Sequence, residues 1–132
     1  MLTNPAGVND LTRTIIGCGV KVHRVLGPGL LESAYAACFE LEMRESGLAI
    51  EVNKPVPLTY RGLRIDVSYR LDFLVNETVV VELKAVDAIG PIHLAQVLTY
   101  LRLLDAPVGL IMNFNAKVLK DGVRRVINST PK

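Results

Sequence analysis

The sequence 71-LDFLVNETVVVELK-84 predicts two short apolar β-strands, each interrupted by charged residues. The first strand carries Asp72, and the second carries Glu82, followed two residues later by Lys84. Two carboxylates and a lysine are the charge set needed to hold a divalent metal ion and to position a water molecule beside a phosphate. The stretch therefore predicts a small metal-dependent nuclease-like domain.

The faces of these two strands decide whether the charged residues meet. Residues two apart on a strand point to the same face, so Glu82 and Lys84 are expected to project together, where Lys84 would orient the attacking water or neutralise charge on the phosphate. A two-residue turn between the strands would place Asp72 opposite Val81, on the other face of the sheet from Glu82. A loop with an odd number of residues, or a β-bulge, is required to bring both carboxylates onto one face.

Composition indicates one globular domain, because 50% of the 132 residues are apolar and 21% are charged. No apolar run approaches the roughly 20 residues of a membrane span, and the first ten residues lack the pattern of a secretory signal, so we expect a cytoplasmic protein. The net charge of +2 permits contact with nucleic acid without requiring it. Cys18 and Cys38 lack the spacing of a metal site, and we expect both to be small buried residues.

Apolar residues spaced three and four apart predict three helices. The first runs from Asp10 to the glycine-proline stop at residues 27–29, and the second covers residues 30–46 before Gly47. The third opens at Gly90-Pro91 and ends before Pro107. The expected core faces are Leu11, Ile15, Cys18, Val22 and Val25 in the first helix, Leu30, Ala34, Cys38 and Leu41 in the second, and Leu94, Val97, Leu101 and Leu104 in the third.

Between residues 48 and 86 the pattern changes to that of three or four antiparallel strands, with a turn at Arg61-Gly62 and β-branched runs at residues 65–67 and 79–81. The continuous apolar run at residues 108–112 predicts a central strand covered on both faces. Asp121-Gly122 predicts a hairpin turn into a last strand near residues 123–127. Residues 1–8 and 128–132 are expected to be flexible.

Further polar residues can line a cleft beside the two strands. Gln96 and Tyr100 lie one helical turn apart, where Gln96 can hydrogen-bond a substrate or hold the lysine and Tyr100 can contact a phosphate. An ordinary boundary between core and solvent explains the same stripe equally well. His93, one turn earlier, is more often a surface or capping residue than a ligand. From spacing alone, Glu32 is explained by its favourable position near the start of a helix.

A solvated sheet face is the competing explanation for the charged strand residues, since most charged residues on strands do no more than alternate with core residues. Three groups of basic residues can steer a polyanion: Lys21 and Arg24; Arg61 and Arg64; and Lys117, Lys120, Arg124 and Arg125. Aromatic residues are few and Trp is absent, which gives little support to sequence-specific recognition of single strands. The sequence contains no phosphate-binding loop, serine-hydrolase elbow or HExxH motif.

The residues GLLESAY at positions 29–35 resemble the signature of the GxxExxY proteins. The resemblance spans residues 9–127 and continues through Val22-His23-Arg24, Gly27-Pro28-Gly29, Lys54-Pro55, Asp72, residues 81–84, residues 96–100 and Asn113-Phe114. Those proteins are grouped with the PD-(D/E)XK nuclease superfamily, whose shared core is a mixed sheet flanked by helices. The resemblance therefore implies an α/β (α+β) fold of the restriction-endonuclease-like type.

The same resemblance assigns roles to individual residues. Asp72 corresponds to the superfamily aspartate, Glu82 and Lys84 correspond to the E-x-K element, and Glu32 corresponds to an acidic residue on the first core helix that completes the metal site. Gln96 and Tyr100 resemble the QxxxY motif of exonuclease-like branches, in which the pair lines the site and contacts the substrate.

Together these observations predict metal-dependent hydrolysis of phosphodiester bonds in nucleic acid, with DNA as the expected substrate. Asp72, Glu82 and Glu32 would bind Mg²⁺ or Mn²⁺, Lys84 would position the water, and the other catalytic residues, Gln96 and Tyr100, would line the cleft. One alternative is a non-catalytic module that retains the fold and binds nucleic acid or a protein. A homodimer built on an apolar helix surface or the sheet edge is also open, because a domain of this size offers limited room to grip duplex DNA.

Overall fold

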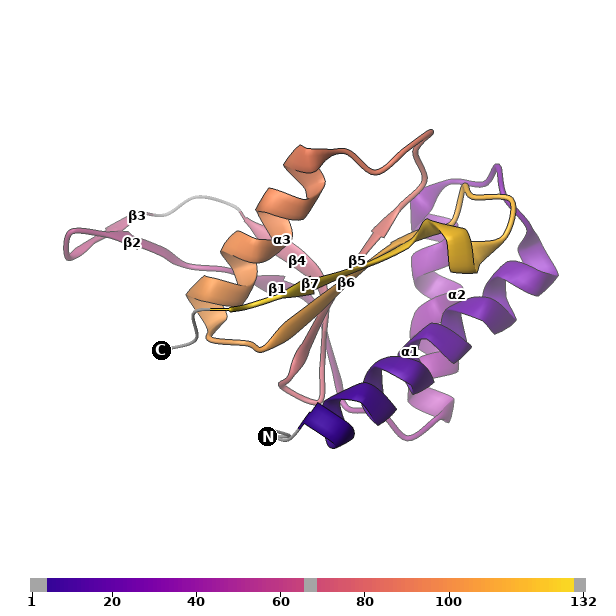
Figure 1. The fold of residues 1–132 in the computed structure, drawn as a ribbon, viewed down its shortest axis with the longest axis horizontal. Coiled ribbons are helices and arrows are strands. Elements are labelled where there is room, and N and C mark those ends of the chain that lie inside the picture. Colours follow the sequence, from indigo (N-terminus) through magenta and orange to yellow (C-terminus); the bar gives the residue numbers. More distant parts are fainter. Residues whose placement is uncertain (1–4, 66–68, 130–132) are drawn as a thin grey trace.

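The computed structural model describes residues 5–65 and 69–129 (Figure 1). Its elements follow one another along the chain as α1 (Pro5–Leu26), α2 (Glu32–Glu45), β1 (Ile50–Pro55), β2 (Leu58–Tyr60), β3 (Leu63–Ile65), β4 (Arg70–Val75), β5 (Val79–Lys84), α3 (Pro91–Leu104), β6 (Val108–Asn113), a 3-10 helix η1 (Leu119–Gly122) and β7 (Val123–Ile127).

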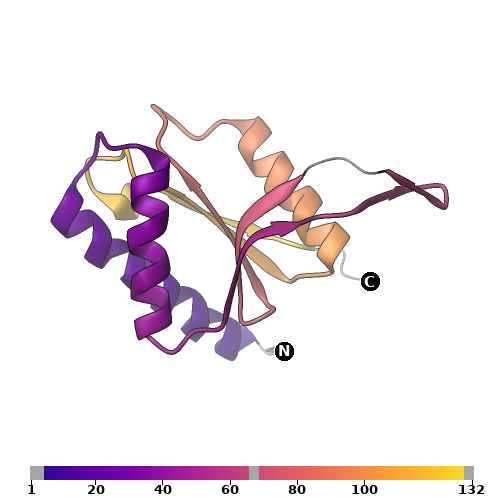
Figure 2. The same ribbon diagram turned by 180° about the vertical axis from the view of Figure 1, so that it is seen from behind.

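Five strands form one mixed sheet in the order β1-β4-β5-β6-β7. Neighbouring strands are antiparallel except for β5 and β6, which are parallel and are connected through α3. A parallel pair needs a crossover connection of this kind, and the helical periodicity of residues 91–104 supplies it. Helices α1 and α2 cover one face of the sheet and α3 covers the other (Figures 1 and 2). The structure thus confirms the expected α+β architecture with a mixed sheet.

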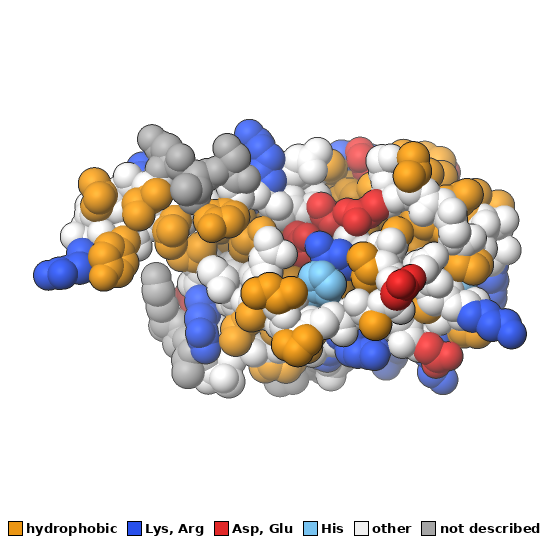
Figure 3. Space-filling model, turned by 90° about the horizontal axis from the view of Figure 1, so that it is seen from above, with side chains coloured by type: hydrophobic (Ala, Val, Ile, Leu, Met, Phe, Trp, Pro, Cys, Tyr) orange, Lys and Arg blue, Asp and Glu red, His pale blue; other side chains and the backbone are white. Residues whose placement is uncertain are grey.

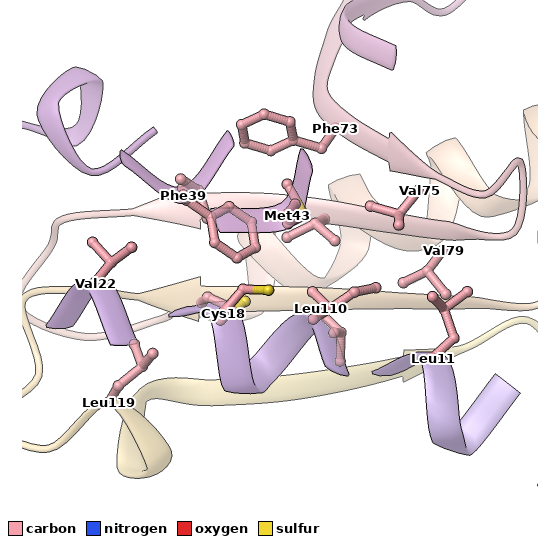
Figure 4. Close-up of a cluster of buried hydrophobic side chains, with 14 of the residues drawn as sticks. Leu11, Cys18, Val22, Phe39, Met43, Phe73, Val75, Val79, Leu110 and Leu119 are labelled. Atoms are coloured by element: carbon pink, nitrogen blue, oxygen red, sulfur yellow. The ribbon is translucent and has the colours of Figure 1, made fainter. Parts of the chain in front are cut away.

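Strand β5 occupies the middle of the sheet, and its side chains alternate between two hydrophobic cores. Val79, Val81 and Leu83 belong to the core beneath α1 and α2, whereas Val80 belongs to the core beneath α3. Figure 4 shows part of the first core, where α1 and α2 pack on the sheet. Because the alternation continues, Glu82 and Lys84 lie on the same face of the sheet as Val80.

The core face of α2 differs from the expected one. Its buried residues are Tyr35, Phe39 and Met43, whereas Ala34 and Cys38 are exposed, and Leu30 and Leu41 are largely exposed as well. The larger side chains at this spacing remove more apolar surface from water, and they outweigh the smaller ones on the neighbouring stripe. The ring of Phe39 packs edge-on against Phe73, with 5.5 Å between ring centroids. The prediction that Cys38 is buried is therefore wrong, and the one for Cys18 is confirmed.

Helix α1 begins at Pro5 rather than at Asp10, so residues 5–8, which we expect to be flexible, belong to its first turns. Its core face contains the predicted residues up to Val22, but Val25 is 83% exposed, and the following residue Leu26 packs against the core instead. At the other end of the chain, Asn128 is buried instead of frayed. Its side chain donates hydrogen bonds to the carbonyl oxygens of Leu101 and Ala106.

The region predicted as three or four strands contains five strands among its described residues. Strands β1, β4 and β5 join the main sheet, whereas β2 and β3 form a separate two-stranded hairpin that projects from the body of the protein (Figures 1 and 2). Its turn lies at Arg61 and Gly62, as expected, and both residues have positive φ angles. The expected strand run 65–67 is described only at Ile65, because residues 66–68 lie outside the described residues.

Strand β6 is buried along its whole length and lies between β5 and β7, which confirms a strand covered on both faces, although β5 rather than β6 is the central strand. The last strand is also confirmed, but it is preceded by the 3-10 helix η1 rather than by a hairpin turn at Asp121-Gly122. Gly122 packs closely here, because a Cβ atom at this position would lie 2.6 Å from the carbonyl oxygen of Asn113. None of the described helices has the length and apolar character needed to cross a membrane.

Candidate active site

The connection between β4 and β5 meets the condition set by the sequence. The strands pair as Val75 with Val79 and Phe73 with Val81, so residues 76–78 form a loop of three residues. Asn76 and Glu77 adopt positive φ angles of 50° and 54°, which tighten the loop. Because three is an odd number, this register sets Asp72 opposite Glu82 rather than opposite Val81.

Beyond the pair Phe73–Val81, the two carboxylates take over the hydrogen bonding between the strands. The backbone N–H of Asp72 donates to Oε1 of Glu82 at 2.9 Å, and the backbone N–H of Leu83 donates to Oδ2 of Asp72 at 2.8 Å. Charge-assisted bonds of this kind are stronger than neutral ones and satisfy backbone donors that the ladder no longer pairs. Asp72 and Glu82 are therefore fixed next to each other where β4 and β5 separate.

Burial raises the pKa values of both carboxyl groups, and the charge of Asp72 raises that of Glu82 further. Glu82 is 5% exposed, and burial together with the charge of Asp72 raises its pKa to about 8. Burial also raises the pKa of the half-buried Asp72, partly offset by the hydrogen bond from the Leu83 backbone and by the charge of Lys84. At neutral pH, Glu82 therefore holds a proton when no cation is bound, and it can hydrogen-bond to Asp72.

Lys84 brings a positive charge to this pair. It is half-buried at the end of β5, on the face of Glu82, and its charge favours the ionised forms of Asp72, Glu82 and Glu32. Among residues 5–65 and 69–129 it forms no ion pair within 4 Å, so its ammonium group is not committed to a single carboxylate. Acidic atoms, a basic side chain and a histidine lie next to one another in the middle of the face seen in Figure 3.

Glu32, the first residue of α2, faces the same region from the neighbouring layer. Burial and the charge of Asp72 raise its pKa, and the charge of Lys84 lowers it. Glu32 and Asp72 both line an open pocket of about 530 Å³ between α2 and the sheet. Within the described residues, however, no three His, Cys, Asp or Glu side chains come close enough to hold an ion together. The structure therefore brings Glu32 near the pair without joining it to them.

Gln96 and Tyr100 approach the pair from α3. The Gln96 amide donates a hydrogen bond of 3.0 Å to the Tyr100 hydroxyl oxygen, which leaves the phenolic hydrogen available to a substrate oxygen. Tyr100 is 3% exposed, and burial together with the charge of Glu82 raises its pKa, so the phenol stays protonated. His93, in contrast, is a capping residue: its Nδ1 accepts the backbone N–H of Gly90 at 3.0 Å at the start of α3.

Three residues that sequence analysis did not assign to the site hold its surroundings in place. The Tyr35 hydroxyl donates to the Gly27 carbonyl oxygen and accepts the Leu30 N–H at 3.1 Å, which fixes the segment before Glu32. The Asn113 side chain bonds both backbone groups of Val86, just after Lys84. The His23 ring nitrogen Nε2 lies 3.1 Å and 2.8 Å from the carbonyl oxygens of Phe114 and Ala116. The available signal was that Tyr35, His23 and Asn113 all belong to the stretches that carry the resemblance to the GxxExxY proteins.

Replacing Glu82 by Gln is expected to stabilise the metal-free protein at alkaline pH. The folded protein keeps a proton on Glu82 up to about pH 8, whereas the unfolded chain releases it near pH 4.5. The stability that this proton provides is therefore fully present below about pH 4.5, falls progressively as pH rises, and is gone above about 8. Gln can still accept from Asp72 N–H and can donate to the Asp72 carboxylate, and it has no proton to lose. We expect the free energy of unfolding to exceed that of the wild type by about 1–3 kcal/mol at alkaline pH.

Urea unfolding in EDTA on both sides of the Glu82 transition checks this expectation. The two proteins should converge in acid and diverge in alkali, and Glu77→Gln, in the exposed loop between β4 and β5, should follow the wild type throughout. Parallel pH profiles for the wild type and Glu82→Gln would show that Glu82 is ionised at neutral pH.

The donor set fits a hard divalent cation. Asp72 and Glu82 each use one oxygen to accept a backbone N–H, and each retains a second carboxylate oxygen. Mg²⁺ and Mn²⁺ prefer such oxygens, and Mg²⁺ commonly takes only one or two carboxylates while it keeps several waters. The pair therefore suffices as direct ligands.

A comparison with protein-family models finds a match to a model described as the PD-(D/E)XK nuclease superfamily, over residues 9–126. No curated protein and no solved structure matches the chain. Nucleases of this superfamily act on nucleic acid and generally use divalent metal ions such as Mg²⁺. The match covers most of the chain and includes the mixed sheet, its flanking helices and the paired carboxylates. This protein belongs to the PD-(D/E)XK nuclease superfamily.

Proposed function

We propose that the protein is a metal-dependent nuclease that hydrolyses phosphodiester bonds in nucleic acid, with DNA as the expected substrate. The observation that carries the proposal is the meeting of Asp72 and Glu82 where β4 and β5 separate, with Lys84 on the same face as Glu82. A solvated face of alternating charges would leave these groups exposed and apart. Here Glu82 is buried, and the carboxylates each bind the backbone of the opposite strand.

Asp72 and Glu82 would hold the Mg²⁺ or Mn²⁺ ion, which supplies charge stabilisation at the phosphate and lowers the pKa of bound water. To bind the cation, Glu82 gives up its proton, so metal affinity rises with pH toward about 8. Glu32 lies too far from the pair for shared direct coordination in this arrangement, so we assign it to the ion through an intervening water.

Lys84 and the α3 pair would then handle the substrate. The Lys84 ammonium group orients the attacking water and offsets negative charge that develops on the phosphate. The phenolic hydrogen of Tyr100, held in position by Gln96, is available to a non-bridging phosphate oxygen. The product carries one more negative charge than the substrate, so contacts from Lys84 and Tyr100 to the phosphate favour its formation. The low exposure of Glu82 and Tyr100 keeps water away and strengthens these electrostatic contacts.

The proposal is tested by incubating the purified protein with labelled single-stranded, duplex and branched DNA and with RNA, in Mg²⁺, Mn²⁺ or EDTA. We expect at least one substrate to be cut with metal and none in EDTA. Equal binding with and without a chelator, and no cleavage of any substrate, would instead identify a non-catalytic binding module. Cleavage that persists in EDTA would contradict the assignment of Asp72 and Glu82.

A further inference from the structure

A second open pocket, of about 400 Å³, lies beside the proposed catalytic centre. Gln96 and Tyr100 form its wall toward the carboxylates, and Tyr69, just before β4, and Leu58 of β2 form part of the rest. Tyr69 lies close enough to Tyr100 to affect its ionisation, and it is 46% exposed. The pocket therefore shares Gln96 and Tyr100 with the proposed catalytic centre, and it offers an accessible aromatic ring.

The projecting hairpin extends this surface outward. In its antiparallel pairing Leu58 lies opposite Ile65 and Tyr60 lies opposite Leu63, so these four residues share one face of the hairpin. Tyr60 is 63% exposed and Leu63 is 65% exposed. Because Leu58 also lines the pocket, one apolar face leads from the hairpin tip to the pocket. Figure 3 shows hydrophobic side chains along this arm, between its tip and the acidic centre.

The chemistry of the surface matches unpaired nucleotides. Arg61, at the hairpin turn, gives this surface positive charge for phosphates, while Tyr60 of the hairpin and Tyr69 of the pocket offer rings on which bases can stack. The Gln96 side chain, with its amide donors and acceptor, lies at the pocket rim, where it can reach the edge of a base. In a duplex the base faces are covered by their neighbours, so only an unpaired base can enter a pocket of this kind.

We propose that this pocket binds one unpaired base stacked on Tyr69, and that the hairpin face formed by Leu58, Tyr60, Leu63 and Ile65 carries the adjoining nucleotides. The substrate is accordingly single-stranded nucleic acid, or a frayed end, rather than intact duplex. This inference rests on the proposed function, because it takes the phosphate next to the bound base as the one that is cut. Recognition is by stacking and charge, so it carries no strong sequence preference.

The test measures binding apart from cleavage. Fluorescence anisotropy of labelled oligo-dT and of a duplex of equal length is recorded with the Glu82→Gln protein, which removes one proposed metal ligand. We expect the single strand to bind at least about 10-fold more tightly than the duplex. Adding Tyr69→Ala should weaken single-strand binding by about 5- to 100-fold, the range for loss of one base-aromatic stack. Tyr69→Phe in the same Glu82→Gln background should preserve binding. Val25→Ala in that background, at an exposed site on α1, is the matched control and should leave binding unchanged.

Each outcome separates this inference from the proposed function. Tighter binding of duplex, or equal single-strand affinity with and without Tyr69→Ala, would overturn the inference, even if the wild type cuts DNA. Single-strand binding that depends on Tyr69 would support it, even if the wild type cuts nothing. Light scattering supplies a further check: a dimer that Tyr60→Ser dissociates, with no binding of oligo-dT, would assign the hairpin face to a second copy of the chain.

Discussion

Glu82→Gln and Lys84→Met are each expected to slow metal-dependent cleavage by at least about 10²-fold while the protein stays folded. The first removes a negative oxygen ligand from the pair that holds the cation, and the second removes the positive charge beside it. Both replacements are close in shape to the residues they replace, so the hydrogen bonds between β4 and β5 and the packing of β5 should persist.

Single-turnover cleavage of the best substrate from the panel, at saturating Mg²⁺, measures the effect. Glu77→Gln in the exposed β4–β5 loop and Lys120→Met on η1 repeat the same chemical changes away from the centre, and they should leave the rate within about twofold of the wild type. Wild-type rates in Glu82→Gln or Lys84→Met would remove those residues from the mechanism. Circular dichroism of all four variants checks that none of them is unfolded.

Phe114→Ala is expected to have the largest effect on stability, lowering the free energy of unfolding by about 3–5 kcal/mol. The Phe114 ring is fully buried and stacks on Tyr35 with 4.8 Å between centroids, and it also contacts Phe39. Its removal leaves a cavity between α2 and the end of β6. Because Tyr35 also anchors the segment before Glu32, we expect cleavage to fall as well.

Urea denaturation with a linear extrapolation measures this loss. Leu31→Ala, at a position that is 77% exposed, is the control and should change the free energy of unfolding by no more than about 0.5 kcal/mol. A loss below about 1 kcal/mol in Phe114→Ala would show that the aromatic cluster of α2 contributes little to the fold.

The sequence predicted the elements with a strong local signal. The Gly90-Pro91 start and the apolar stripe at Val97 and Leu101 define α3, and the uniform apolar run at residues 108–112 defines an interior strand. In α2 two apolar stripes compete. Small residues such as Ala34 and Cys38 have helical spacing, but the aromatic side chains of Tyr35 and Phe39 have more surface to bury. The buried face of the helix therefore lies about one residue further along the sequence than expected.

The sequence named candidate residues for the site, but it did not determine how they are arranged. Asp72 and Glu82 meet because residues 76–78 form an odd-numbered loop, and that length depends on two positive φ angles at Asn76 and Glu77, which need not be glycine. The tethers made by Tyr35 and Asn113 were not predictable, because their partners are backbone groups whose positions exist only in the folded chain. The separate β2–β3 hairpin was not predictable either, because its position depends on where β1 leaves the main sheet.

Calorimetric titration of Mn²⁺ into the wild type, Asp72→Asn and Glu82→Gln at neutral pH tests most directly whether Asp72 and Glu82 form a metal centre. We predict that the wild type binds Mn²⁺ with release of a proton, seen as a heat that changes with the ionisation enthalpy of the buffer, since Glu82 must ionise to take part. Both variants should bind at least about 10-fold more weakly, and Glu82→Gln should release no proton. Equal affinities in all three proteins would contradict the account, because the ion would then be bound elsewhere.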